Sequence, residues 1–361
     1  MKKPRILMAC MLAGTLLHAK AEFTYEWRYE DGYAYWYENG IRQGTVDDPK
    51  GVRDTQYGQI VRGREIYDPD SDAWYWLDAD HNGAKAVSKD VWMPYVYQNE
   101  KPGSTDGKWV RYDEYGRMIK GEQYDPVHNG WYYFDVITGM MCKGWAELNG
   151  NDVYYDPVTG KLTYGTFIVD GIVYTAGFNA AIVECIIPDA QYYSQIDPRW
   201  ASVVIGSGSI HDNGCSCCVA TTIFNYYKGT SYTPVDVANL FHSWGHYNSS
   251  NGHGTDSGVW RLAAQHFDLT FHNSLSFEET CRQLLRGNMV SACVTNGIFV
   301  QGAWSHNILM LGLTQQKQTY VFDPLHPDRN GWYSVWDIYH QRSSDPVDLI
   351  DGGPWIALGK R

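Results

Sequence analysis

The sequence predicts a multidomain protein in which an N-terminal, solenoid-like region of β-hairpin repeats precedes an α+β domain. The first region repeats a unit of aromatic pair, glycine turn and second glycine, with a period of roughly 20 residues. This pattern stops after Ile182, where mixed helical and strand-like runs begin. A chain of 361 residues is long enough for two domains. We therefore expect repeats over 22–183 and a second domain over 184–361.

Charge and aromatic content limit the classes of partner. The net charge is −12, with 29 Lys and Arg against 41 Asp and Glu, which argues against nucleic acid as the main partner. The chain has 28 Tyr and 15 Trp but only 11 Phe. Tyr and Trp suit half-exposed positions, where a ring packs and its polar edge meets water or a ligand. This bias favours repeated ligand-facing surfaces.

The N-terminus predicts a secretory signal peptide over residues 1–21. Residues 2–5 form a positive region with Lys2, Lys3 and Arg5, 6–17 form an apolar run, and 19–21 form an A-x-A cleavage site. The apolar run is too short to span a bilayer, and no later segment predicts a membrane span. A lipoprotein signal ending at Cys10 is the alternative. We expect the mature protein to be secreted or associated with the cell wall.

The cysteines predict a free thiol rather than a metal centre. Seven remain after the signal: Cys142, Cys185, Cys215, Cys217, Cys218, Cys281 and Cys293. An odd number in an exported protein indicates at least one free thiol. The Cys-x-Cys-Cys run lacks the C-x-x-C pairs of structural zinc sites. Residues 78–83 match the start of a calcium loop, but Lys89 stands where a bidentate acid is needed. We expect no metal and no cofactor.

Each repeat predicts a β-hairpin made of an aromatic strand, an Asp/Asn-x-x-Gly turn and a second short strand. The clearest copies span 109–121, 131–145 and 152–165, whereas those at 33–40 and 74–78 lack the regular second half. One hairpin cannot bury its own face. Neighbouring hairpins must therefore stack.

Residues 130–145 resemble the cell-wall-binding (choline- or glucan-binding) repeats of Gram-positive surface proteins. In that family, aromatic side chains of adjacent hairpins enclose a quaternary ammonium group or stack on a sugar. The resemblance implies a wall polymer (choline, teichoic acid or glucan) as partner. It also implies Trp131, Trp145 and Tyr154 as the first ligand-binding candidates. The alternative is that these rings only pack the hairpins together.

The second domain contains a candidate nucleophile. An Asn-Gly turn at 213–214 delivers Cys215 to the start of a segment with helical apolar spacing. The free N–H groups at a helix start stabilise a thiolate, so the pKa of such a thiol falls and the thiol becomes more reactive. Cys217 or Cys218 is the alternative nucleophile if the helix begins later. All three cysteines could also be small core residues.

A candidate base lies downstream of the cysteine run. A nucleophilic thiolate needs a His and a group that orients it. His306 opens an apolar strand, and Asp323 ends the next strand. The start of one strand and the end of the next are neighbours in an antiparallel hairpin, so these two residues can pair.

The other expected elements fit an α+β domain. Helices are expected at 233–241 and 276–285, and strands at 289–294, 307–313 and 319–322.

The segment 190–336 resembles the C39-like branch of papain-like cysteine peptidases. The matching elements are an upstream Gln, Gly-Cys at a helix start, a small residue before His, and Asp-Pro, in that order. The resemblance implies a Cys215-His306-Asp323 triad, with Gln195 and the cysteine N–H holding the oxyanion. Ser216 and the next cysteine replace the Gly-Pro of that family.

These observations favour a secreted, wall-associated cysteine peptidase that hydrolyses peptide bonds through a thioester. Its expected partners are a peptide or peptidoglycan substrate and a wall polymer bound by the repeats. A peptidoglycan amidase or endopeptidase with the same triad is the first alternative. A wall-binding adhesin without catalysis is the second.

Overall fold

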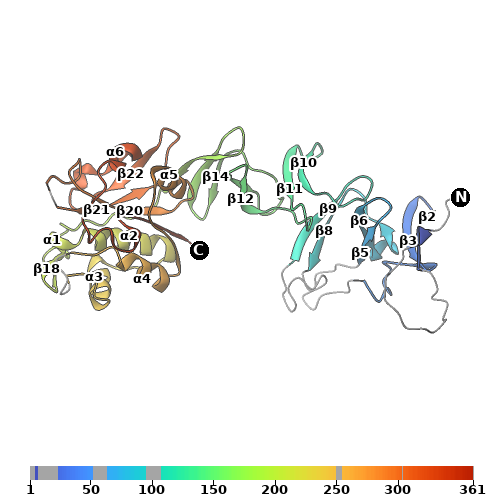
Figure 1. Ribbon diagram of the computed structural model, residues 1–361, viewed down its shortest axis with the longest axis horizontal. Coiled ribbons are helices and arrows are strands. Elements are labelled where there is room, and N and C mark those ends of the chain that lie inside the picture. The colour runs from blue at the N-terminus through green and yellow to red at the C-terminus, as the bar shows by residue number, and fades with distance from the viewer. Residues whose placement is uncertain are drawn as a thin grey trace, which may run out of the picture. The chain divides into compact units, whose positions relative to one another are not determined.

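A computed structural model describes residues 5–6, 23–51, 63–94, 107–248, 254–302 and 304–360 (Figure 1). The chain forms two compact units. The first comprises Met1–Ala146 and Tyr155–Leu162, and the second Glu147–Tyr154 and Thr163–Arg361. Apart from β1 (Arg5–Ile6), the expected signal peptide lies outside the described residues. No helix among the described residues is long and apolar enough to cross a membrane.

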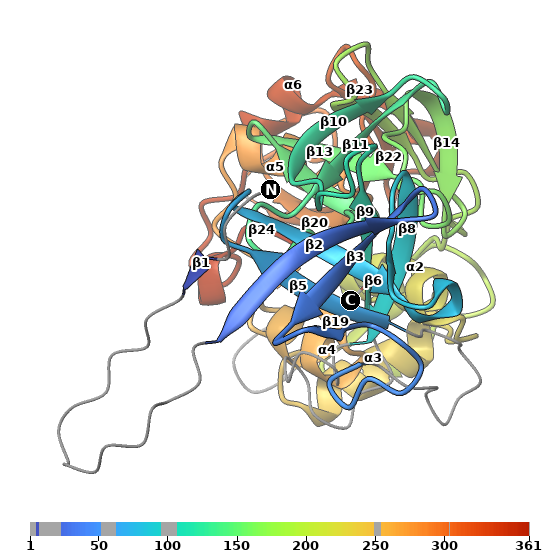
Figure 2. The ribbon, with the colours of Figure 1, turned by 90° about the vertical axis from the view of Figure 1, so that its right-hand side faces the viewer.

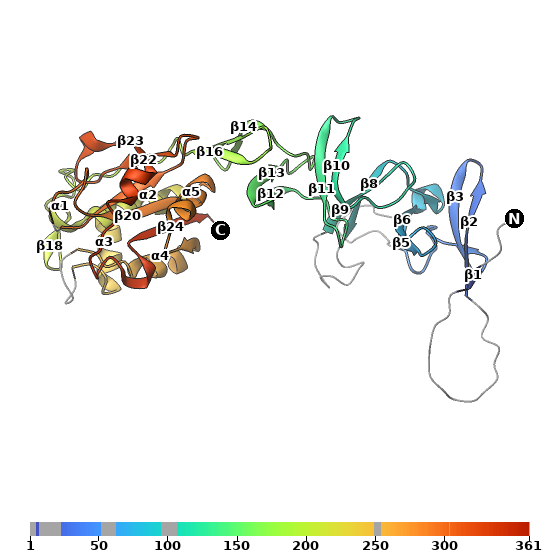
Figure 3. The same ribbon diagram turned by 45° about the horizontal axis from the view of Figure 1, so that its top comes forward.

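Small antiparallel sheets make up the repeat region, as the hairpin pattern predicts. A seven-stranded sheet combines β1 with β2 (Thr24–Glu30), β3 (Tyr33–Glu38), β4 (Ile41–Arg42), β5 (Gly63–Asp68), β6 (Ala73–Asp78) and β7 (Ala84–Lys85). Two-stranded sheets follow: β8 (Lys89–Pro94) with β9 (Gly107–Tyr112), β10 (Gly121–Asp125) with β11 (Gly130–Phe134), and β12 (Gly144–Leu148) with β13 (Asn151–Tyr155). Figure 3 shows β10 and β11 side by side.

Turn chemistry explains why these segments fold back. At Asn39-Gly40 and Asn149-Gly150 both residues have positive φ, which a two-residue type I′ hairpin turn requires. Consecutive repeats are joined through their backbones, because Met141 donates an N–H to the Trp109 carbonyl at 2.7 Å. In the same way Leu162 donates to the Trp131 carbonyl at 2.8 Å. This stacking gives each hairpin a partner for its buried face.

The second unit begins with a three-stranded sheet of β14 (Gly165–Val169), β15 (Ile172–Ala176) and β16 (Ile182–Ile186). A six-stranded antiparallel sheet follows, in the order β19 (Leu269–His272), β24 (Trp355–Lys360), β20 (Met289–Val294), β21 (His306–Leu311), β22 (Gln318–Phe322) and β23 (Gly331–Ser334). Its helices are α1 (Ile210–Asn213), α2 (Cys215–Lys228), α3 (Pro234–Ser243), α4 (Val259–His266), α5 (Phe277–Leu285) and α6 (Val335–Tyr339), and β17 (Val204–Ile205) pairs with β18 (Gly208–Ser209).

Local sequence signals account for the expected helices and strands. Thr233 caps α3 in a capping box with Asp236, and Pro234 is its first residue. Ser276 caps α5 by accepting the Glu279 N–H. The strands expected at 289–294, 307–313 and 319–322 correspond to β20, β21 and β22, shifted by two residues or fewer.

The six-stranded sheet is covered on both faces (Figures 1 and 2). Helix α2 packs on one face against Leu309 and Leu311 of β21. Helices α5 and α6 cover the other face, where Ile308 and Met310 are buried. Every residue of β20 and β21 is therefore buried, and the start of β21 is held firmly relative to the start of α2.

Candidate active site

Cys215 is the first residue of α2, as the sequence predicts. Gly214 precedes it and joins α1 to α2 so tightly that a Cβ there would lie 2.5 Å from the Ile210 carbonyl oxygen. Side chains larger than glycine are thus excluded from this junction. The thiol of Cys215 consequently lies beside the unbonded N–H groups of the first turn.

The three clustered cysteines occupy different environments. Cys215 is partly exposed, whereas Cys217 and Cys218 are 0% and 1% exposed. Burial raises the pKa of both buried thiols well above the ordinary value. Because the helix begins at Cys215, the geometry favours that residue as the reactive thiol.

His306 and Asp323 form the pair that the hairpin argument predicts. The ring Nε2 of His306 lies 2.7 Å from Oδ1 of Asp323, and both side chains are buried. The same oxygen accepts the N–H groups of Leu325 and His326 at 2.9 and 3.0 Å. Burial opposes ionisation of Asp323, but His306 and these N–H groups outweigh it and hold its pKa below the ordinary value.

The electrostatics favour a thiolate–imidazolium pair. Burial lowers the pKa of His306, but hydrogen bonds to Asp323 and Cys215 outweigh it and raise the pKa to about 9. Burial likewise raises the pKa of Cys215, yet His306 and the N–H groups of Asn307 and Ser216 bring it below the ordinary value. Since Nε2 of His306 is hydrogen-bonded to Asp323, Nδ1 is the ring nitrogen available to the Cys215 thiol.

Gln195 is hydrogen-bonded to segments that carry the other candidates. Its Nε2 donates to the His211 carbonyl, four residues before Cys215, and its Oε1 is buried with no hydrogen-bond partner among the described residues. Its backbone N–H donates to the Pro324 carbonyl at 2.9 Å. The structure therefore brings together Cys215, His306 and Asp323, and it connects Gln195 to the neighbours of Cys215 and Asp323 in the chain; its oxyanion role stays a prediction.

Asn307 is a site residue that the sequence analysis missed. Its Nδ2 donates to Oγ of Ser216 at 3.0 Å and to Oγ of Ser291 at 2.9 Å. Ser216 and Asn307 directly follow Cys215 and His306, so this hydrogen bond joins α2 to β21 beside the candidate catalytic pair. An amide in an otherwise apolar strand was the available signal.

The aromatic candidates of the repeats lie in different settings. Trp131 and Trp145 are 41% and 42% exposed, and Trp131 packs against Tyr124 with ring centroids 5.4 Å apart. Tyr154 stacks on Phe167 at 5.0 Å, which fits a packing role. Tyr154 belongs to the second unit and the two tryptophans to the first, so a shared ligand site remains a prediction.

Asp78, the first residue of the calcium-like loop, forms an ion pair with Lys89. This lysine is the residue that stands in place of the required acid. Among the described residues, no group of three or more His, Cys, Asp or Glu side chains could hold a metal ion.

No protein-family model matches the chain, and no curated protein matches it. Among solved structures, the chain is similar to CbpJ of Streptococcus pneumoniae, with 26% identity over 43% of this chain and a TM-score of 0.26. It is similar to choline-binding protein F of Streptococcus pneumoniae, with 24% identity over 47% of this chain and a TM-score of 0.20. These matches cover 51% and 58% of the two proteins, so the chain spans little more than half their length.

A third similar structure is a protein described as a C39-like peptidase of Bacillus anthracis. It shares 15% identity over 49% of this chain and 98% of its own, with a TM-score of 0.35.

Proposed function

We propose that this chain is a secreted, wall-associated cysteine peptidase whose second unit is a papain-like catalytic domain. One observation supports this proposal above the others. The Cys215 thiol at the start of α2 has a lowered pKa because of His306. The Nε2 of this histidine is hydrogen-bonded to the buried carboxylate of Asp323. A merely structural cysteine would resemble its buried neighbours and have a raised pKa.

In the proposed reaction, the Cys215 thiolate attacks the carbonyl carbon of a peptide bond. The oxyanion that forms accepts hydrogen bonds from the Cys215 N–H and the Gln195 amide. His306 gives its proton to the leaving amine as the C–N bond breaks and a thioester remains. Neutral His306 then takes a proton from water, whose oxygen attacks the thioester and releases the carboxylic acid. Asp323 keeps the ring oriented and stabilises its charged form.

The proposed role of the repeats is to hold the enzyme on a cell-wall polymer after export. Their exposed tryptophans offer apolar and cation-binding faces for such a polymer. Deleting 22–183 should release the protein from walls, and unchanged retention would contradict this role. Because β14–β16 belong to the second unit, deleting only 22–143 is the matched comparison that spares this sheet.

The test of the peptidase proposal is the pH dependence of thiol alkylation, resolved by peptide mapping. Cys215 should label quickly at pH values well below the ordinary thiol pKa of about 8.5. Cys217 and Cys218, as buried controls in the same helix, should label slowly. Cys215→Ala should abolish hydrolysis of peptide substrates while wall binding persists. Retained hydrolysis in this variant would refute the assignment and favour another nucleophile.

A further inference from the structure

The first unit contains a pocket that the peptidase proposal does not use. It encloses about 410 Å³ and is formed by two consecutive repeats and the turn that follows them. Its lining combines aromatic, apolar and charged side chains. The lining residues are Asp90, Trp109, Arg111, His128, Tyr132, Met141, Lys143, Val158, Thr159 and Lys161. Pockets with an apolar base and a few convergent polar groups are typical ligand sites.

The charged groups of the lining are unevenly satisfied. Arg111 binds both oxygens of Asp90, at 2.6 and 2.9 Å, and also Oδ2 of Asp125 at 3.0 Å, so its single positive charge is shared between two carboxylates. Lys143 and Lys161 instead donate to backbone carbonyls, of Val158 at 2.8 Å and His128 at 3.3 Å. Among the described residues, neither ammonium group forms an ion pair with a carboxylate. Two ammonium groups thus line the pocket without a close ion pair among the described residues, and Asp90 and Asp156 act on Lys143 only from a greater distance.

The aromatic face of the pocket already has a cation beside it. Nζ of Lys143 lies 5.2 Å from the centroid of the Trp109 ring, within cation–π distance. A ligand carrying a quaternary ammonium group would meet this charge at the same ring, and like charges in a partly buried site repel each other. Burial also lowers the pKa of Lys143, so a bound anion would stabilise its charged form.

We propose that this pocket binds an anionic saccharide or polyol, with its ring or carbon chain against Trp109 and its carboxylate or phosphate between Lys143 and Lys161. The ligand class follows from three features of the described residues: two ammonium groups that form no close ion pair, an Asp90 carboxylate already bound by Arg111, and a partly exposed indole. Lysine binds such anions as a point charge with three donors, so either anionic group fits. This proposal is independent of the hydrolase, because every residue of the pocket belongs to the first unit.

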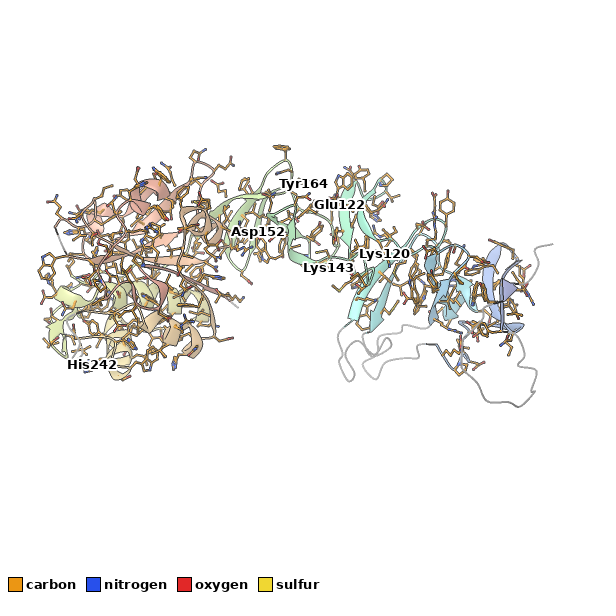
Figure 4. All side chains as sticks on the ribbon, in the orientation of Figure 1. Lys120, Glu122, Lys143, Asp152, Tyr164 and His242 are labelled. Carbon is orange, nitrogen blue, oxygen red and sulfur yellow. The ribbon has the colours of Figure 1, made fainter. Side chains whose placement is uncertain are left out.

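Lys120 provides a matched control (Figure 4). It directly precedes β10 as Lys143 directly precedes β12. Its Nζ donates to the Ile137 carbonyl at 3.0 Å, in the same turn position as Val158 one repeat later. Unlike Lys143 it is exposed and does not line the pocket. Replacing either lysine by Met removes the same carbonyl contact, but only the replacement at 143 changes the charge of the pocket.

The experiment is calorimetric titration of the full chain at low salt with four probes: tetragalacturonate, a glycerol phosphate oligomer, neutral isomaltotetraose and choline. We expect at least one anionic probe to bind at least tenfold more tightly than the neutral one. The K143M and K161M variants should weaken that binding about tenfold each, as expected for losing a charge-assisted hydrogen bond. K120M should leave it unchanged, and added salt should weaken it. Comparison of the two anionic probes identifies carboxylate or phosphate as the preferred group.

Three results would overturn the proposal. The first is failure of both anionic probes to bind, or equal affinity for isomaltotetraose. The second is choline binding that K143M weakens, which would make the pocket a cation site. The third is an equal loss of affinity in K120M and K143M, which would assign the effect to the lost carbonyl contact. Thermal unfolding of each variant verifies that the hairpins remain folded.

Discussion

Replacing Asp323 by Asn tests whether this carboxylate keeps the proton on His306. The hydrogen bond between His306 Nε2 and Asp323 Oδ1 is 2.7 Å long and buried, and a charge-assisted bond of this kind contributes about 1.5–3 kcal/mol. At 1.36 kcal/mol per pKa unit, its loss lowers the pKa of His306 from about 9 by about 1–2 units. The pKa of His306 would then be about 7–8, so a proton on His306 becomes about 10- to 100-fold less favoured relative to one on the Cys215 thiol, and the thiolate–imidazolium pair is weakened.

The assay is the rate of iodoacetamide alkylation at Cys215 between pH 5 and 10. In the D323N variant the rate at pH 6–7 should fall about 10- to 100-fold, the same 1–2 units expressed as a ratio. The rate above pH 9 should change little, because the thiol then ionises without help from His306. D212N is the matched control, since Asp212 contacts His211 at 2.9 Å on the surface. Superimposable profiles for D323N and the parent protein would refute the reasoning.

Three further substitutions separate the roles of other groups. Gln195→Ala should lower kcat on a peptide substrate about 10²- to 10³-fold, the usual cost of losing an oxyanion donor, and leave Cys215 alkylation unchanged. A small effect on kcat would remove Gln195 from the site. Asn307→Ala leaves two buried serine hydroxyls without their amide partner and should lower the free energy of unfolding in urea by about 1–3 kcal/mol. An unchanged unfolding midpoint would contradict this expectation. Cys218→Ala should reduce stability by about 1 kcal/mol, while Cys215 is still alkylated at neutral pH. Loss of Cys215 labelling in this variant would reopen the choice of nucleophile.

The pairing of His306 with Asp323 was predictable because it depends on neighbouring strands of one hairpin. The observed register pairs Leu309 with Phe322 and Met310 with Val321. If this register is continued by one residue, Asp323 lies opposite Ile308. His306, two residues before Ile308, is then the diagonal neighbour of Asp323. Sequence alone gives the adjacency but not this register, because the turn length that sets the register is not specified by apolar alternation.

The approach of Cys215 to His306 depends on contacts between distant segments. Helix α2 lies against β21, which is far along the chain, and periodicity alone does not say which face of the sheet a helix covers. The sequence suggested this contact through the need of a thiolate for a base and through the resemblance to C39-like peptidases, but not through any local pattern. The amide of Asn307 stood out in its apolar strand, but its role could not be assigned because its partners, Ser216 and Ser291, lie on other elements.

In the repeats, too, the sequence indicated some features of the structure and not others. The resemblance to cell-wall-binding repeats selected Trp131 and Trp145, and both side chains are partly exposed. This resemblance does not indicate that Lys143 would reach over Trp109 of the preceding repeat, because that contact depends on how far successive hairpins rotate and stack. Sequence analysis therefore selected exposed rings, whereas the pocket is lined by a different set.

The replacement of the family's Gly-Pro by Ser216 and Cys217 is the strongest sequence argument for a module without catalysis, and the structure weakens it. A proline after the nucleophile would constrain the start of the helix through its fixed φ. Here the constraint has another source. Gly214 permits the close approach of α1, and the Ser216 hydroxyl accepts a hydrogen bond from Asn307 at 3.0 Å. Since Asn307 directly follows His306, this bond fixes the Cys215 thiol and its proposed base relative to each other.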